Sequence, residues 1–454
     1  MTLLLRNVFW VLCLCMLVGC AAHGLPRWRN FQGDLPGQGY LSVESGFAVS
    51  SAWRSSPYSI TTSSPVIGVD SDGREVIYFG TVDGELVALN SEDGNERWRR
   101  SFATDSKSTA IISTPAISTD GSIYVITNQR YEDGLIRSVL HKVDEFSRIR
   151  WSYTISDDGF TSGAPKVLVW GQDTLVFIYV TLFVDENPQG ALLVLLDKGK
   201  EVDVLDRESL GTCQWGSTDL QAHREDVVNA LAALWDFSSV FTPETADGGK
   251  QIPDIFIDPS VAVMTARKLP LIAIADNLCN LGAFEWDDEL SIVWREFHPY
   301  EKHSSTALLP NGLMVFGRQS GSVLAHDMET GLKIWSYHAG RPVFATPAAT
   351  HSYLFVVAKD HLIVLNQKDG SLVYDADSPR QFRLPHQTYA SPAVTQNRVY
   401  VSTSAMMTFS YELSTRSQDT NFRGNGLASI ALGNNGAIYA VAVDGTIHKY
   451  LGPK

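Results

Sequence analysis

Cysteine is scarce in this chain, which has 5 cysteines among 454 residues. Cys13, Cys15 and Cys20 lie close to the amino terminus, so only Cys213 and Cys279 remain in the body of the chain. So few cysteines exclude the disulfide framework of a small secreted domain, and no Cys-x-x-Cys spacing indicates a redox or zinc site. Two interpretations of Cys213 and Cys279 stay open: one disulfide bond, or two buried thiols in neighbouring strands.

Positive charge is also in short supply. The chain has 36 lysines and arginines against 50 aspartates and glutamates, which gives a formal net charge of −14 at pH 7. No block of basic residues is interleaved with aromatic residues. Nucleic acid is therefore not an expected partner, and the acidic surface would not bind anionic lipid through its charge.

Catalytic motifs are absent as well. The sequence has no Gly-x-Ser-x-Gly, no His-Glu-x-x-His and no Gly-x-x-x-x-Gly-Lys. His298 and His303 flank Glu301 and could touch a metal ion, but the alternative is a loop with exposed histidines. We predict that the protein is not an enzyme and holds neither a metal nor a cofactor.

Long hydrophobic runs are missing except near the amino terminus, where Arg6 precedes an apolar run from Val8 to Val18. This run is too short to cross a bilayer, and with the small residues after it predicts a signal peptide over residues 1–19. The ending Leu17-Val18-Gly19-Cys20 resembles a bacterial lipobox, which implies cleavage before Cys20 and a lipid on its thiol. The alternative is an ordinary signal peptide with a chance cysteine.

The predicted lipid also sets the expected location. Alanine, rather than aspartate, follows Cys20. This start resembles lipoproteins that are sorted to an outer membrane and face the periplasm. We expect residues 20–45 to be a lipidated linker and residues 46–454 to form the globular part.

An eleven-residue phrase occurs three times, at residues 88–98, 325–335 and 364–374. Each copy has Asn or Asp near its start, a Gly in the middle and an aromatic residue four positions after the Gly. Asn and Asp suit turns, and Gly supplies a positive φ. The phrase therefore predicts a β-hairpin whose second strand carries an aromatic side chain.

Three short strands precede the last strand of each hairpin, and the units recur along the whole chain. Five units start at Ser64-Pro65, Thr114-Pro115, Ala164-Pro165, Thr346-Pro347 and Ser391-Pro392, and weaker starts lie near Pro259, Ser305 and Ala428. Units about 40–50 residues apart are typical of the four-stranded blades of a propeller. We predict an all-β propeller of about eight blades, or seven, because the unit near Pro259 is divergent.

The final unit predicts how the ring closes. It ends at Tyr450 without an aromatic fourth strand, whereas residues 46–53 have strand character and end in Trp53. We predict that this early segment completes the last blade, so that both ends of the chain share one sheet and leave no exposed edge.

The pattern Ala-x-Asp-x-x-Thr-Gly-x-x-x-Trp, complete at residues 325–335, resembles the tryptophan-docking repeat of quinoprotein-type (PQQ-like) β-propellers. The resemblance covers residues 46 to 450, and the segment from Trp28 to Asp34 also resembles the one that leads into such propellers. It implies structural docking aromatics at Trp53, Trp98, Trp151, Trp294, Trp335 and Tyr374. Catalytic members hold a quinone and calcium in the funnel, and some carry adjacent cysteines, which this chain lacks after residue 19.

One insertion interrupts the repeat at about residues 205–255. Thr218 to Gln221 has the form of a capping box, and apolar residues follow on one face at helical spacing, which predicts a helix over residues 218–236. The helix would pack on the propeller rim, or the loops around it would bind a partner, since long insertions on a rigid scaffold carry function.

We expect a non-enzymatic envelope lipoprotein that acts as a protein-binding scaffold. Its combination of lipobox and propeller resembles that of a lipoprotein in the machinery that assembles outer-membrane β-barrels, which makes this machinery the expected partner. The alternatives are recognition of a small molecule or glycan in the funnel, and a quinone-dependent dehydrogenase. Fold alone does not decide among them.

Overall fold

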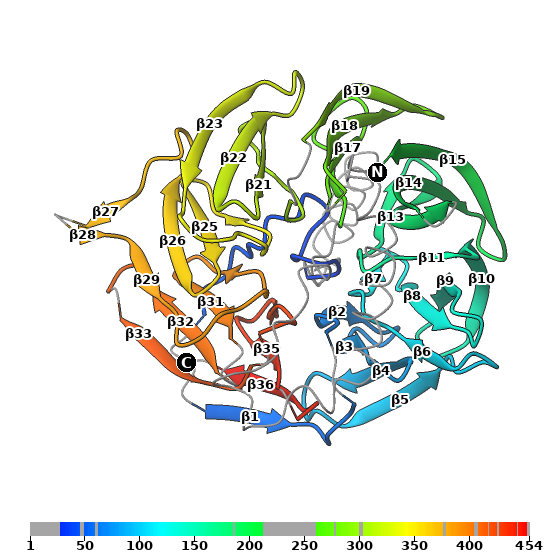
Figure 1. Cartoon of the computed structure of the whole chain (residues 1–454). Helices are drawn as coiled ribbons and strands as arrows, with labels where there is room; N and C mark the ends of the chain where they lie inside the picture. The colour runs from blue at the N-terminus through cyan, green and yellow to red at the C-terminus, as the bar shows by residue number, and fades with distance from the viewer. Residues whose placement is uncertain are drawn as a thin grey trace, which may run out of the picture.

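The computed structural model describes residues 28–45, 50–59, 62–184, 187–211, 260–276, 278–298, 303–375, 378–403, 407–415, 417–424, 426–442 and 444–451. These residues form eight β-sheets that stand as blades around a central axis, and they contain no helix (Figure 1). The predicted all-β propeller of eight blades is confirmed. The helix predicted over residues 218–236 lies outside the described residues.

Each blade has four antiparallel main strands, numbered here from the axis outward. Blade 1 has β2 (Val66–Val69), β3 (Glu75–Gly80), β4 (Glu85–Asn90) and β5 (Glu96–Ser101); blade 2 has β7 (Ala116–Ile117), β8 (Ile123–Arg130), β9 (Ile136–Val143) and β10 (Ile149–Ser156); blade 3 has β12 (Lys166–Trp170), β13 (Asp173–Val184), β14 (Asn187–Asp197) and β15 (Val202–Gly211); blade 4 has β16 (Ala262–Met264), β17 (Leu271–Ala275), β18 (Asn280–Trp286) and β19 (Leu290–Phe297).

The second half of the ring follows the same plan. Blade 5 has β20 (Ala307–Leu308), β21 (Leu313–Gly317), β22 (Ser322–Asp327) and β23 (Lys333–His338); blade 6 has β24 (Ala348–Ala349), β25 (Tyr353–Ala358), β26 (His361–Asn366) and β29 (Gln381–Arg383); blade 7 has β30 (Ala393–Val394), β31 (Arg398–Ser402), β32 (Thr408–Glu412) and β33 (Gln418–Phe422); blade 8 has β34 (Ala431–Leu432), β35 (Ile438–Val441), β36 (Ile447–Leu451) and β1 (Ser50–Arg54).

Because successive strands of a blade are antiparallel, the turn after the first strand and the turn after the third lie on the same face of the ring. We call this the docking-turn face; in blade 1 it carries residues 70–74 and 90–95. The turn between the second and third strands lies on the opposite face.

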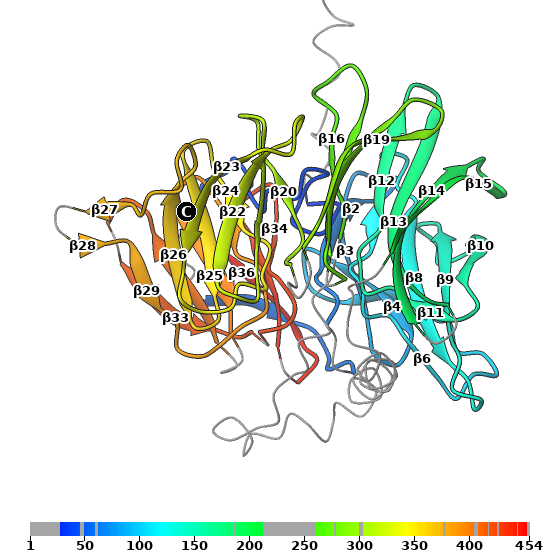
Figure 2. The same cartoon turned by 45° about the horizontal axis from the view of Figure 1, so that its top comes forward.

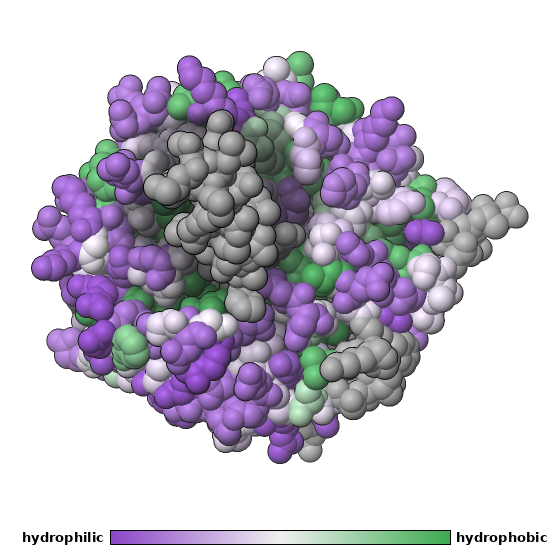
Figure 3. Space-filling model, turned by 180° about the vertical axis from the view of Figure 1, so that it is seen from behind, coloured by the Kyte–Doolittle hydropathy of each residue, from purple (hydrophilic) through white to green (hydrophobic). Residues whose placement is uncertain are grey.

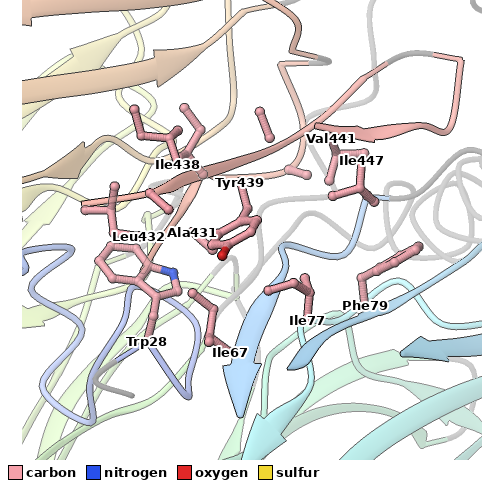
Figure 4. Packing of buried hydrophobic residues seen from close by; sticks show 14 of the residues in the cluster. Trp28, Ile67, Ile77, Phe79, Ala431, Leu432, Ile438, Tyr439, Val441 and Ile447 are labelled. Carbon is pink, nitrogen blue, oxygen red and sulfur yellow. The ribbon is translucent and has the colours of Figure 1, made fainter. Parts of the chain in front are cut away.

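The core lies between neighbouring blades. Inner strands such as β21 are buried at every position, which explains their continuous apolar sequences, whereas the outermost β5 has only exposed and partly buried side chains. Figure 4 shows one of the clusters, in which Ile67 and Ile77 of blade 1 and Ile438 of blade 8 pack near Trp28. Each blade therefore buries its faces against its two neighbours.

The predicted closure of the ring is confirmed. Strand β1 pairs antiparallel with β36, and the two lie side by side in Figure 1, blue beside red. The backbone N–H of Ser55 continues the contact by donating to the carbonyl of Ile447 at 2.9 Å. Residues 46–49 of the predicted strand lie outside the described residues.

Residues 28–45, which we name the central segment, are not a linker but part of the propeller. The segment runs through the middle of the ring (Figure 1) and hydrogen-bonds to the innermost strands of blades 1 to 7 in turn. Its carbonyl groups accept from the backbone N–H of Ile67, Ile117, Val263, Leu308, Ala349 and Val394, and those of Phe31 and Asp34 accept from the Lys166 ammonium group. The predicted boundary at residue 46 therefore falls inside the folded ring.

Both ends of the central segment lie on the docking-turn face. Arg29 lines the same hollow as residues of the β2–β3 and β7–β8 turns. At the other end, the carbonyl of Glu44 lies against Gly436 in the β34–β35 turn. The segment thus enters and leaves the ring on one side.

Hydroxyl groups of the Ser-Pro and Thr-Pro phrases join successive blades near the axis. The backbone N–H of Ser64 in blade 1 donates to the hydroxyl of Thr114 in blade 2 at 3.1 Å. Equivalent bonds run from Ala164 to Ser260, Ser260 to Ser305, Thr346 to Ser391, Ser391 to Ser429 and Ser429 to Ser64. The last of these bonds joins blade 8 to blade 1.

Blades 2 and 3 carry longer hairpins on the face opposite the docking turns. Short strands β6 (Ser108–Ala110) and β11 (Gly159–Phe160) pair with the extended parts of β8 and β13. The buried amide of Asn128 ties the two extensions together, because it donates to the carbonyl of Thr161 at 3.0 Å and accepts from the Thr161 N–H at 3.2 Å. We call these two joined extensions the raised surface of blades 2 and 3.

Candidate functional site

The predicted docking aromatics occupy the outer strands, and their indoles reach the docking turns of the following blade. The Nε1 atoms of Trp53, Trp294 and Trp335 donate to backbone carbonyls of Ser91, Met328 and Gln367 at 2.9, 3.0 and 3.2 Å. Each ring covers the glycine of the next phrase, where a Cβ atom would come within 2.4 to 2.6 Å of the indole. Glycine is therefore required for space as well as for its positive φ.

The other members of the set differ in their contacts. Trp98 donates to the carbonyl of Glu145 at 2.7 Å, and Trp151 donates to the carboxylate of Asp197 at 3.0 Å. Tyr374 is 59% exposed and lies in β27 (Tyr374–Asp375), which pairs with β28 (Ser378–Pro379) in a ribbon that stands away from the rim in Figures 1 and 2. Phe382 of β29 instead contacts Tyr411 of the next blade.

A buried ion pair joins blades 2 and 3 on the docking-turn face. The Lys142 ammonium donates to Asp197 at 2.6 Å, and the Tyr124 hydroxyl and Trp151 indole donate to the same carboxylate. Burial alone would raise the pKa of Asp197, but the hydrogen bonds from Lys142 and Tyr124 outweigh it and hold the pKa below its usual value. A fully partnered pair of this kind fixes how the two blades meet.

A hollow of about 690 Å³ opens beside this pair, across blades 1 to 3. Its walls come from the docking turns and the start of the central segment; the charged residues among them are Arg29, Asp70, Asp120, Lys142, Asp144, Glu145, Arg150 and Lys200. A volume in the range of about 300–1,000 Å³ suits a small molecule. This hollow is the candidate functional site.

Arg29 is held in place by its backbone, because its N–H donates to Gly33 at 3.1 Å and its carbonyl accepts from Ile117 at 2.9 Å. Its side chain is half-buried and makes no ion pair with the described residues. Burial lowers the pKa of Arg29. Nothing in the local sequence marks this residue, since the fold brings its neighbours from three blades.

The two histidines considered as metal ligands, His298 and His303, have different surroundings in the structure. His298 lies between Glu296 and Arg318, at 3.0 Å from each, whereas His303 is buried and contacts the carbonyl of Asp276 through Nδ1 at 3.1 Å. His303 is therefore not an exposed loop histidine, and Glu301 lies outside the described residues. Among the described residues, no group of three or more His, Cys, Asp or Glu side chains could hold a metal ion.

Of the two cysteines in the body of the chain, the structure describes only Cys279. Cys279 is fully buried in the β17–β18 turn and is disulfide-bonded. Its expected partner Cys213 lies outside the described residues, so the pairing of the two stays a prediction. The lipid site Cys20 lies outside them too. In the described part of the chain, no helix is long and apolar enough to span a membrane.

Hydrophilic residues cover most of the face of the ring in Figure 3, and hydrophobic residues appear there in small separate groups. Scattered apolar residues are normal on a protein surface. The described surface in this view therefore marks no single large apolar docking patch.

The ring of blades with indoles docked onto glycines defines the class of PQQ-like β-propellers. A family model described as the outer membrane protein assembly factor BamB matches residues 49–178 and 286–447, and the chain belongs to this family. Between the two matched stretches lie most of blade 3, the insertion and the three inner strands of blade 4. A search of curated proteins found no match.

Solved structures show the same fold at low sequence identity. The europium-containing methanol dehydrogenase is 12% identical with a TM-score of 0.61, covering 92% of this chain and 90% of its own. Sqt1 of Saccharomyces cerevisiae is 8% identical with a TM-score of 0.57, covering 90% and 100%. BamB from Moraxella catarrhalis is 15% identical with a TM-score of 0.49, covering 91% and 96%. Likeness at these identities shows the fold alone and does not decide the function.

Proposed function

We propose that the protein is a lipid-anchored, non-enzymatic scaffold of the cell envelope, with the machinery that assembles outer-membrane proteins as its partner. The observation that carries this proposal is the family match over most of the blades. The rigid construction of the ring supports it, because the central segment and the closure by β1 fix all eight blades relative to one another.

The central segment also suggests which face meets the partner. Only a few residues separate Cys20 from Trp28, and they span at most about 28 Å when fully extended. A lipid on Cys20 would therefore hold the docking-turn face toward the membrane. The raised surface of blades 2 and 3, on the opposite face, would be left for other proteins.

A photo-activated crosslinker at two matched positions tests this proposal. Glu132 lies in the exposed turn between β8 and β9, and Asp72 lies in an exposed turn of the docking-turn face. We expect the acylated protein to copurify with barrel-assembly components and to crosslink to them from Glu132 but not from Asp72. Purification without stoichiometric partners, or crosslinking from Asp72 alone, would contradict the proposal.

The second candidate is recognition of a small polar molecule in the funnel, and Gln32 of the central segment favours it. Gln32 is 2% exposed, has a φ of 58° and has no hydrogen-bond partner for either atom of its amide among the described residues. A buried amide in a left-handed conformation is unusual and can mark a binding position. Titration with a quinone and calcium, and with a panel of sugars, tests this candidate and the dehydrogenase together.

A further inference from the structure

In the hollow on blades 1 to 3, the carboxylates all have partners, whereas two of the cations make no ion pair with the described residues. Asp70 accepts from Arg74 at 3.1 Å and from Arg97 at 2.5 Å. Asp144 accepts from Arg148 and Arg150, both at 2.8 Å.

The remaining carboxylates are also engaged. Asp120 accepts from the backbone N–H of Ser122 at 2.9 Å and from the hydroxyls of Ser118 and Ser122. Glu145 accepts from the N–H of Ser71 at 2.8 Å. The bonds to Asp120 lie within its own turn, whereas the bond to Glu145 joins the docking turns of blades 1 and 2.

Two cations of the hollow are left over. Lys142 and Arg150 pair with Asp197 and Asp144, but neither Arg29 nor Lys200 makes an ion pair with the described residues. Lys200 is exposed to solvent, whereas Arg29 is half-buried at the inner end of the hollow. A guanidinium that is partly buried without a counter-ion is destabilised, because it loses favourable hydration. An anionic ligand would compensate for this loss.

We propose that the hollow binds a small organic anion and that the guanidinium of Arg29 holds its carboxylate or phosphate group. Guanidinium presents parallel N–H donors that match both groups, so the two are the ligand chemistries to test. The volume exceeds that of a bare ion, which leaves room for an organic body against the apolar part of the wall at Val69, Ile117 and Ile149. Lys200 adds charge at the outer rim.

Isothermal titration of the purified full chain with citrate, succinate and inorganic phosphate, and with glycerol as a neutral probe, tests this inference. We expect at least one of the three anions to bind with a Kd below about 1 mM, and glycerol not to bind. Arg29→Gln should raise that Kd by about tenfold to a hundredfold, because a charge-assisted bond is lost. Lys200→Gln should raise it by less than about fivefold, since the group is exposed.

Arg383→Gln is the matched control, because Arg383 is exposed on β29 and makes no ion pair with the described residues. It should leave the Kd unchanged. An equal Kd in Arg29→Gln, an equal effect of Arg383→Gln, or no binding of any of the three anions would overturn the inference.

A second measurement does not depend on the folding of a variant. Phenylglyoxal modifies arginine side chains, and mass spectrometry can follow its adduct at Arg29 in the wild-type protein. The anion that binds should slow modification of Arg29 at least fivefold, roughly as expected for mostly occupied sites, without slowing that of Arg383. Unchanged modification of Arg29 at a saturating concentration would also overturn the inference, whatever the outcome of the partner experiments.

Discussion

A glycine covered by an indole is the smallest unit from which this ring is built. Gly370 has a φ of 69° and lies under Trp335, whose indole would be 2.4 Å from a Cβ atom at that position. Two constraints thus meet at one residue, a left-handed backbone and a close aromatic contact. The same pairs, Gly94 with Trp53 and Gly331 with Trp294, recur around the ring.

Gly370→Ala should therefore destabilise the protein more than backbone strain alone. The left-handed conformation costs about 1 kcal/mol for alanine, and displacing the buried indole adds roughly 1–3 kcal/mol. Gly340→Ala is the control, because Gly340 has a φ of 70° but a Cβ atom there would meet no other atom within 4 Å. Urea unfolding of both variants measures the difference, and equal losses would show that the indole contact contributes nothing.

Among the elements, the repeated hairpins were predictable and the central segment was not. The Gly-x-x-x-Trp spacing at 94–98 and 331–335 is local, so it can be read directly from the sequence. Tyr374 has the same spacing, but the ribbon β27–β28 displaces it from the blade. The central segment has no strand pattern, and its partners lie far along the chain, as with the bond from Leu308 to Pro36. Arg29 could not be predicted for the same reason.

The sequence suggested two roles for the amino-terminal region, a lipidated linker and a strand that closes the ring. Truncation at two positions distinguishes these roles. A chain that begins at Trp28 should keep its melting temperature within about 2 °C of that of the longer protein, because it retains the central segment and β1. A chain that begins at Thr62 loses the burial of Trp28, Leu41 and Trp53 and should melt at least about 10 °C lower. Differential scanning calorimetry checks both, and an unchanged melting temperature for the shorter chain would contradict a structural role.

At the scale of the whole molecule, buried histidines make the ring sensitive to acid. Burial lowers the pKa of His141 in blade 2 and of His303 in blade 5 to about 3, and that of His448 in blade 8 to about 4. Asp276 acts in the opposite direction, because burial raises its pKa to about 6. Burial also lowers the pKa of His326 and raises that of Asp34, so four histidines outweigh two carboxyl groups.

The sign of the pH dependence follows from proton binding. In the unfolded chain these histidines titrate near pH 6.5, so below that pH the unfolded state binds protons that the folded state does not. The free energy of unfolding should fall by roughly 2–4 kcal/mol between pH 7 and pH 5. Urea unfolding at both values measures it. His303→Gln should reduce the pH dependence, whereas His338→Gln, at an exposed position, should leave it unchanged.

The central segment also sets the order in which the molecule can be completed. Synthesis makes this segment first, yet it bonds to blades whose strands are made later, and the bond between Ser55 and Ile447 joins residues 392 positions apart. Contacts between distant parts of a chain form slowly, because a long loop must close first. Strand β1 therefore cannot pair until β36 has been made. A chain cut short before blade 8 lacks the partner of β1, so the ring cannot close.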